Sequence, residues 1–294
     1  MTYKRRLATL MTALIAAAYA VLIPTRAHAQ CDATSIRGNY GFKIHELVVD
    51  PAHPGHLVIG TFVPAAFVGQ MVFNPATGQV TGFRTGNEGG MPKMNTLNTT
   101  TDPSTYSVNS DCTGMLNLVL DDGSSRAYGI VIVKGGGEIE LAVQSASIAV
   151  VGDGVAKLQP PTCDVTTIAG YFGVRFNRLL APNGQISGNR FDLGAFTPAD
   201  SAGWLLFDAT STPQSVSGQL AGITDGTASF DSPVAGSYSA NTNCTGTLTF
   251  TDSEGVTKEL GMAIVKDGAD IEIEFANTTQ PGAQIVGEGV GKKQ

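Results

Sequence analysis

The feature that most constrains this chain is an internal repeat. The segment Tyr106–Leu116 recurs as Tyr238–Leu248, and seven of the eleven positions are identical. The two copies lie 132 positions apart, and the same offset carries Cys31 onto Cys163. Further matches keep their order along most of the chain. The sequence therefore predicts one folding unit written twice, each copy about the size of a modest single domain.

The boundaries of the two units follow from these matches. The first unit spans residues 30–158, and the second spans residues 159–294. The joint is Gln159-Pro-Pro-Thr162, and two prolines in so short a link predict a fairly stiff connection.

The first 29 residues have the pattern of an export signal. A basic start precedes the apolar run from Leu7 to Ile23, and an A-x-A box follows at Ala27–Ala29. This is the order of features in a secretory signal peptide. The apolar run is short for a membrane span, which argues against a retained anchor. We predict cleavage after Ala29 and a secreted or periplasmic protein.

The net charge disfavours two classes of partner. The chain carries −7 at neutral pH, and loss of four positive charges with the signal leaves −11. A surface this acidic repels phosphate backbones and anionic lipid. We therefore expect no nucleic-acid partner and no membrane insertion after signal cleavage. The sequence leaves the oligomeric state open.

The four cysteines are expected to form one disulfide in each unit. An exported chain permits disulfides, and four cysteines allow three pairings. The repeat selects Cys31–Cys112 and Cys163–Cys244, because both pairs span 81 positions and duplication of a self-contained unit would duplicate its bridge. No C-x-x-C spacing supports metal ligation by these cysteines.

Apolar and polar residues alternate in a way that predicts strands throughout. In Glu138–Val143 and Asp270–Phe275 acidic and apolar residues alternate with period two, which indicates half-buried strands. Turn clusters separate such segments, and no mature segment has a helical period. A meander of about eight strands has unpaired edges unless it closes. We predict an all-β fold of two tandem antiparallel β-barrels, with a two-sheet sandwich as the alternative.

The alternation also predicts which side chains face water. With no helices to cover the barrels, the acidic residues should point outward and the apolar residues should line the lumen. A barrel of about eight strands is either filled by its side chains or holds one small ligand. The acids expected to face water are Glu138, Glu140, Asp270, Glu272 and Glu274.

The densest polar cluster holds all three histidines of the mature chain. His45, His53 and His56 lie close together in a stretch with several carboxylates, and imidazoles are natural zinc or copper ligands. Their spacing fits no standard site, and the matching stretch of the second unit has no histidine. A solvated loop is the favoured interpretation, and we expect no metal or cofactor.

A second polar cluster contains Arg84 and Glu88. An arginine and a carboxylate near a barrel rim could bind an anion or polarise a carbonyl, and Lys43 and Glu46 add acid–base groups to the same unit. The second unit lacks the Arg–Glu pair, and such a pair is more often a surface ion pair of little energetic value.

Three aromatic residues are candidates for ligand contact. Tyr40 and Phe172 occupy matching positions near the start of each unit, where packing is the favoured role. Trp204 is matched by Gln70 in the first unit, so it is a candidate for a ligand contact or an inter-unit contact.

Three motifs together carry a resemblance. The motifs are Gly38-x-Tyr-Gly-Phe42, Tyr106-x-Val-Asn-x-Asp-Cys-Thr-Gly114 and Gly152-x-Gly-Val-Ala-Lys157. As a set they resemble repeat units of exported bacterial proteins without an assigned activity. The unit also resembles small closed barrels of the lipocalin and allene-oxide-cyclase kinds, which implies a closed antiparallel barrel but transfers no catalytic residue.

Three functions are compatible with this sequence. The leading hypothesis is a non-enzymatic binding or surface-interaction module, with a small apolar ligand in one or both lumens as its more specific form. The second is a cofactor-free isomerase or cyclase that acts inside a barrel, with Lys43, Glu46, Arg84 and Glu88 as acid–base groups. The third is a structural component of the cell envelope.

Overall fold

The computed structural model describes residues 30–49, 62–89, 91–98, 102–146, 150–181, 197–224, 227–252, 255–278 and 284–294. These residues are all-β, with single-turn 3₁₀ segments and no α-helix. None of the described helical segments is long and apolar enough to cross a membrane. Cys31–Gln294 forms one compact unit. The predicted signal, residues 1–29, lies outside the described residues.

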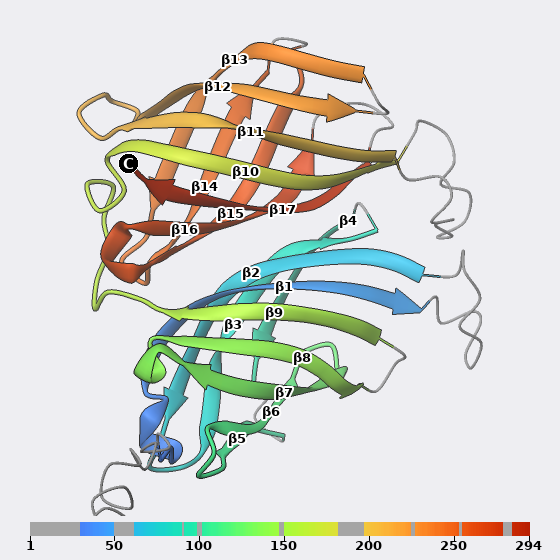
Figure 1. Cartoon of the computed structure of the whole chain (residues 1–294), viewed down its shortest axis with the longest axis vertical. Helices are drawn as coiled ribbons and strands as arrows, with labels where there is room; N and C mark the ends of the chain where they lie inside the picture. The colour runs from blue at the N-terminus through green and yellow to red at the C-terminus, as the bar shows by residue number, and fades with distance from the viewer. Residues whose placement is uncertain are drawn as a thin grey trace, which may run out of the picture. The chain divides into compact units, whose positions relative to one another are not determined.

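The first barrel is a closed ring built from nine strands (Figure 1). Strand β1 pairs with both β2 and β9, which closes the ring. Strands β4 and β5 share one place in it, because β3 pairs with β5 at its first two residues and with β4 from Gly82 to Glu88. The strands of barrel 1 are β1 (Gly38–Val49), β2 (Phe62–Asn74), β3 (Gln79–Glu88), β4 (Met91–Leu97), β5 (Ser104–Val108), β6 (Thr113–Val119), β7 (Ser125–Val133), β8 (Glu138–Ala146) and β9 (Val150–Leu158).

The second barrel is a closed ring of eight strands (Figure 1). Strand β10 pairs with β11 and β17, and the long strand β13 fills the place that β4 and β5 share in barrel 1. The prediction of two tandem barrels is confirmed, and the sandwich alternative is not observed. The strands of barrel 2 are β10 (Gly170–Ala181), β11 (Thr197–Asp208), β12 (Ser215–Thr224), β13 (Thr227–Ala240), β14 (Thr245–Thr251), β15 (Thr257–Val265), β16 (Asp270–Thr278) and β17 (Gln284–Lys293).

Both predicted disulfides are present at corresponding places. Cys31 bonds to Cys112 and Cys163 bonds to Cys244, each with 4.9 Å between the Cα atoms. In barrel 1 the bridge fixes the segment that carries the 3₁₀ turn η1 (Ala33–Ser35). The hydroxyl of Tyr106 donates to the carbonyl oxygen of Ala33 at 3.0 Å and thereby anchors the same segment. The most similar stretch of the two units is therefore structural.

Two further 3₁₀ turns, η2 (Lys134–Gly136) and η4 (Lys266–Gly268), occupy matching positions in the barrels. Each ends in a glycine with positive φ, +91° at Gly136 and +82° at Gly268. A Cβ at either position would lie within 2.3 Å of a carbonyl oxygen in the segment before the first strand of the same barrel, Ser35 in barrel 1 and Thr167 in barrel 2. Only glycine fits this close approach without strain.

Buried apolar side chains form a core inside each barrel. In each barrel three aromatic rings pack edge to face, with centroids 5.0 to 5.3 Å apart, a preferred geometry for aromatic pairs. The aromatic sets are Tyr40, Phe73 and Tyr106 in barrel 1, and Phe172, Phe207 and Tyr238 in barrel 2.

The prediction that the alternating acids face water is wrong for four of the five. Glu140 is exposed, but Glu138, Asp270, Glu272 and Glu274 are buried. Their apolar neighbours on β16, Ile271 and Ile273, do face the interior of barrel 2, as predicted. The acids of β16 therefore lie on the outer wall, and the other barrel covers that wall. The prediction failed because it treated each barrel as isolated.

The contact between the barrels is an ionic and hydrogen-bonded seam. The Nζ atom of Lys43 lies 3.3 Å from Glu272 and 3.4 Å from Glu288. Lys157 also pairs with Glu272. Burial disfavours the charged form of Lys157, but Glu272 and the neighbouring acids raise its pKa overall. Gln159, in the joint, donates to the carbonyl oxygens of Cys244 and Ile264 at 2.9 and 3.2 Å.

Candidate functional site

Barrel 1 contains a buried charged cluster that barrel 2 lacks. Tyr40, Phe42 and Ile44 alternate into the core of barrel 1, so the same alternation of β1 carries Glu46 into the interior. Arg84 comes from β3, and Arg126 and Tyr128 come from β7. All four side chains are at most 2% exposed.

The four side chains of this cluster are in direct contact. The Tyr128 hydroxyl donates to Oε1 of Glu46 at 2.6 Å. Arg126 Nε lies 3.4 Å from the same oxygen, and Arg84 Nη1 lies 3.8 Å from Oε2. The guanidinium of Arg84 also stacks 3.8 Å from the ring centroid of Phe67. One carboxylate thus stands between two guanidinium groups and a phenol.

The environment keeps the phenol of this cluster protonated. Burial raises the pKa of Tyr128 well above its usual range, and the adjacent Glu46 raises it further. Burial lowers the pKa of Arg84, while Glu46 acts in the opposite direction. Arg84 Nε donates to Asn95 at 3.1 Å, and Asn95 in turn donates to Asp121 at the rim. The network therefore connects the interior to the β6–β7 turn.

The matching positions of barrel 2 have lost the cluster. The register places Leu220 at the position of Arg84 and Leu260 at the position of Tyr128. Arg178 replaces Glu46, and its Nε donates to the carbonyl oxygen of Ala199. Lys258 replaces Arg126 and pairs with Asp252 near the rim. The core of barrel 2 is consequently apolar along most of its depth.

The other predicted catalytic residues lie elsewhere. Lys43 points outward into the seam. Glu88 ends β3 and pairs with Lys93 of β4 at 2.8 Å. Of the four candidates, only Glu46 and Arg84 come together, and they are surrounded by Phe67, Tyr128 and Arg126. This cluster can link strands β1, β3 and β7 across the interior of barrel 1 and stabilise the buried Glu46 carboxylate.

The predicted histidine cluster is only partly described. His45 lies on β1 with its side chain half-buried, while His53 and His56 lie outside the described residues. Among the residues that the structure describes, no three His, Cys, Asp or Glu side chains are grouped to hold a metal ion.

The aromatic candidates divide into two kinds. Tyr40 and Phe172 are core residues, and the Tyr40 hydroxyl donates to the carbonyl oxygen of Gly136. Burial raises the pKa of Tyr40 to about 12. Trp204 instead lies on the outer wall of barrel 2, half-buried, with its ring 5.7 Å from that of Tyr171.

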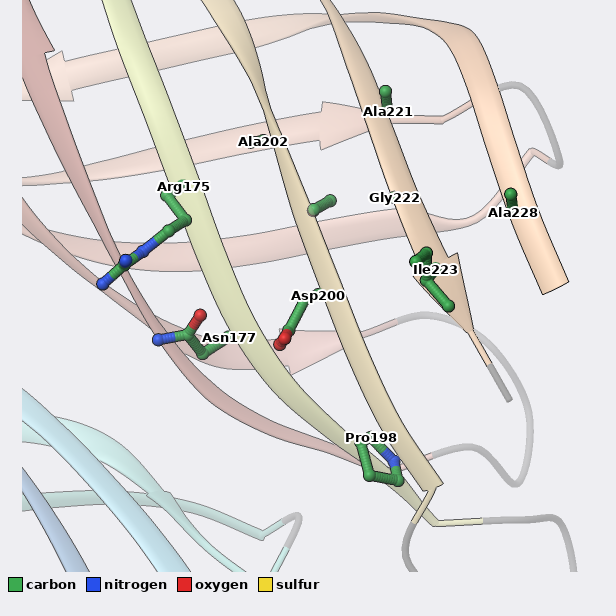
Figure 2. Close-up of a pocket in the computed structure, with 10 residues that line it drawn as sticks. Arg175, Asn177, Pro198, Asp200, Ala202, Ala221, Gly222, Ile223 and Ala228 are labelled. Atoms are coloured by element: carbon green, nitrogen blue, oxygen red, sulfur yellow. The ribbon is translucent and has the colours of Figure 1, made fainter. Parts of the chain in front are cut away.

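A groove of about 750 Å³ lies on the outer wall of barrel 2. Figure 2 shows its residues on adjoining strands, with Arg175 and Asn177 on β10, Asp200 on β11 and Ile223 on β12. Ala202 and Ala221 add small apolar surface, and Ile223 is 55% exposed. The groove is thus mostly apolar, with charged side chains along one side.

Sequence reasoning missed Arg126, Tyr128 and this groove. The alternation in β7 contained a usable signal, because Arg126 and Tyr128 share the parity of the core residues Ile130 and Ile132. The groove left no such signal, since its residues come from four strands and are individually ordinary.

Comparisons with known proteins identify no family for this chain. No family model and no curated protein matches the chain. Among solved structures, a redesigned β-barrel is 14% identical, covers 44% of this chain and 94% of its own, and has a TM-score of 0.29. The vaccine antigen transferrin-binding protein B of Haemophilus parasuis is 8% identical over 86% of this chain and 75% of its own, with a TM-score of 0.29.

A third structure, a protein of Nitrosomonas europaea described as AttH, is 9% identical over 88% of this chain and 93% of its own, with a TM-score of 0.23. Scores this low carry no information about function, and we transfer nothing from these proteins.

Proposed function

We propose that this chain is an exported, non-enzymatic binding module whose binding surface is the groove on the outer wall of barrel 2. The proposal depends on the difference between the interiors of the two barrels and the outer wall of barrel 2. Buried, mostly apolar side chains form a core inside each barrel, whereas the groove on the outer wall offers about 750 Å³. That volume lies within the range of sites for small molecules or partner side chains. The two disulfides indicate an oxidising, extracytoplasmic compartment.

The lining of the groove suggests the chemistry of its ligand. Ala202, Ala221 and Ile223 supply apolar surface, and the exposed Arg175 supplies a positive charge beside it. A ligand that carries an apolar group next to a carboxylate or another anion satisfies both features. The small apolar ligand expected in a lumen is therefore reassigned to the outer wall, with a negative charge added.

Binding is favoured over catalysis by the packing around Glu46 and Arg84, the two proposed acid–base residues that the structure brings together. Glu46 and Arg84 are fully surrounded in barrel 1, where Tyr128 and Arg126 already contact the carboxylate. A reacting group would need space within hydrogen-bond reach of them.

The proposal can be tested with the apolar anion 1-anilinonaphthalene-8-sulfonate. Trp204 is the single tryptophan of the chain and lies on a groove strand, so energy transfer from it reports a dye bound nearby. We expect saturable binding with energy transfer. Ile223→Asp and Arg175→Glu should each weaken it about tenfold, because one removes apolar contact and the other reverses the charge.

Met94→Asp is the matched control, since Met94 is a highly exposed apolar residue of barrel 1. Its dye affinity should equal that of the wild type. Equal affinity for the Ile223→Asp variant and the wild type would contradict the proposed site, and so would dye binding without energy transfer from Trp204.

A further inference from the structure

The seam joins two different surfaces of the repeated unit. Barrel 1 contributes the outer wall of β1, β2 and β3, which we call the basic face because it holds Lys43. Barrel 2 contributes the outer wall of β15, β16 and β17, which we call the acidic face because it holds Glu272, Glu274 and Glu288. Since the two faces differ, the contact is heterologous. It leaves the basic face of barrel 2 and the acidic face of barrel 1 without this partner.

The register defines the matching residues of the two barrels. Lys43 lies opposite Val68 on β2, as Arg175 lies opposite Ala202 on β11. Asn87 lies opposite Ala66, as Ile223 lies opposite Asp200. The groove of barrel 2, which contains Arg175, Ala202 and Ile223, is therefore its basic face. It is the counterpart of the surface that barrel 1 uses in the seam.

The unused faces carry exposed apolar side chains at positions that the seam buries. Val131 is 46% exposed, whereas its counterpart Ala263 is fully buried. Val151 is 49% exposed, whereas its counterpart Val286 is 1% exposed. On the other unused face Ile223 is 55% exposed, whereas Asn87 is 1% exposed. Such positions on a matching wall indicate surfaces that are covered in an assembly.

At the position of Lys43 the charges of the two unused faces are complementary as they are in the seam, while Asp200 adds an acid to the groove where the seam has Ala66. Lys43 pairs with Glu272 and Glu288. The counterparts of these acids in barrel 1 are Glu140 and Asp153, both exposed. Arg175, the counterpart of Lys43, would meet this same pair of acids. Charge complementarity of this kind sets the register of an interface.

A further pair of seam positions carries different residues on both unused faces. In the seam the backbone of polar Asn87 faces the Glu274 carboxyl, and the corresponding pair on the unused faces is Ile223 and Ala142. Both positions thus carry apolar side chains on the unused faces. Gly261 permits the close approach of Val68, and its counterpart on the unused acidic face is again a glycine, Gly129.

We propose that the groove of barrel 2 binds the acidic face of barrel 1 of a second copy of this chain, so that copies join head to tail. This inference rests on the proposed function, because it names the occupant of the same groove. Arg175 of one copy pairs with Glu140 and Asp153 of the next, and Ile223 packs near Ala142 and Val151. A repeated heterologous contact gives a ring if the rotation closes and a filament if it does not.

Sedimentation of the full chain tests this arrangement through charge reversal. The wild-type mass should rise with concentration to at least twice that of the monomer. Arg175→Glu places Glu against Glu140, and Glu140→Arg places Arg against Arg175, so each variant alone should associate about tenfold more weakly or worse. A mixture of the two variants should assemble, because each groove then meets an opposite charge.

Arg37→Glu is the control, since Arg37 is exposed and lies outside both faces; it should assemble like the wild type. Rescue in the mixture shows that both variants are folded. A monomeric wild type at all concentrations overturns the inference, as does a mixture that stays monomeric while the wild type assembles. The dye titration, made on dilute monomer, decides the groove proposal separately, so either proposal can fail alone.

Discussion

Glu274 is expected to make the stability of the seam depend on pH. It is fully buried on the outer wall of barrel 2, and neither carboxyl oxygen has a side-chain hydrogen-bond partner among the described residues. Burial raises its pKa well above the ordinary value of 4.5, although the backbone N–H of Asn87 acts in the opposite direction. The folded chain therefore holds a proton that the unfolded chain releases.

The sign and size of the effect follow from this difference. Because the folded pKa is raised, the contribution of Glu274 is fully present below pH 4.5 and is lost as the pH rises toward the folded pKa. The loss is at most about 1.4 kcal/mol per pH unit. Glu274→Gln cannot ionise, so between pH 5 and pH 7 the variant should gain stability relative to the wild type, by at most about 3 kcal/mol.

Urea unfolding at a series of pH values measures this gain. Parallel stability curves for the Glu274→Gln variant and the wild type would refute the reasoning, because they would mean that Glu274 ionises in the folded chain as easily as in the unfolded chain.

Three further predictions concern stability. Glu46→Gln leaves two buried guanidinium groups without a counter-charge and should cost about 3–5 kcal/mol in urea unfolding, whereas Leu at positions 46, 84 and 126 together should recover most of the loss. Replacing Cys31 and Cys112 by Ser opens a loop of 81 positions and should cost about 4 kcal/mol in the chain-entropy model, seen as a lower Tm whose remaining response to reductant comes from Cys163–Cys244 alone. Gln159→Ala removes two seam hydrogen bonds and should cost about 1–3 kcal/mol, seen as faster amide exchange at Ile264; unchanged exchange would contradict this role.

The sequence was sufficient for the fold because the fold depends on local and repeated signals. Alternation placed Ile139 and Ile271 inside their barrels, and duplication selected the two disulfide pairs. The division of β4 from β5 was not predicted. Predicting it requires knowing that β3 changes its partner strand after Val80. Pairing between strands that are distant in sequence produces no local sequence pattern.

The candidate sites were less predictable because they depend on which surfaces meet. Glu46 and Arg84 were singled out as reactive groups, and the structure does bring them together. Their partner Arg126 could be found only from the alternation along β7, in which Arg126 falls on the side of the inward-facing residues. Lys43 was grouped with them by nearness in sequence, although odd and even residues of one strand face opposite sides of the wall.

The heterologous seam has a consequence for how the two copies of the unit came to differ. Within one chain the joint, in which Gln159 itself contributes to the seam, keeps the two faces at the high effective concentration of a tethered pair. The tethered contact therefore tolerates an unfavourable group such as the buried Glu274. The untethered faces have no such assistance, and there the corresponding pair is Ala142 and Ile223. Covalent linkage thus relaxes selection on one contact, while its counterpart must gain its affinity from the side chains alone.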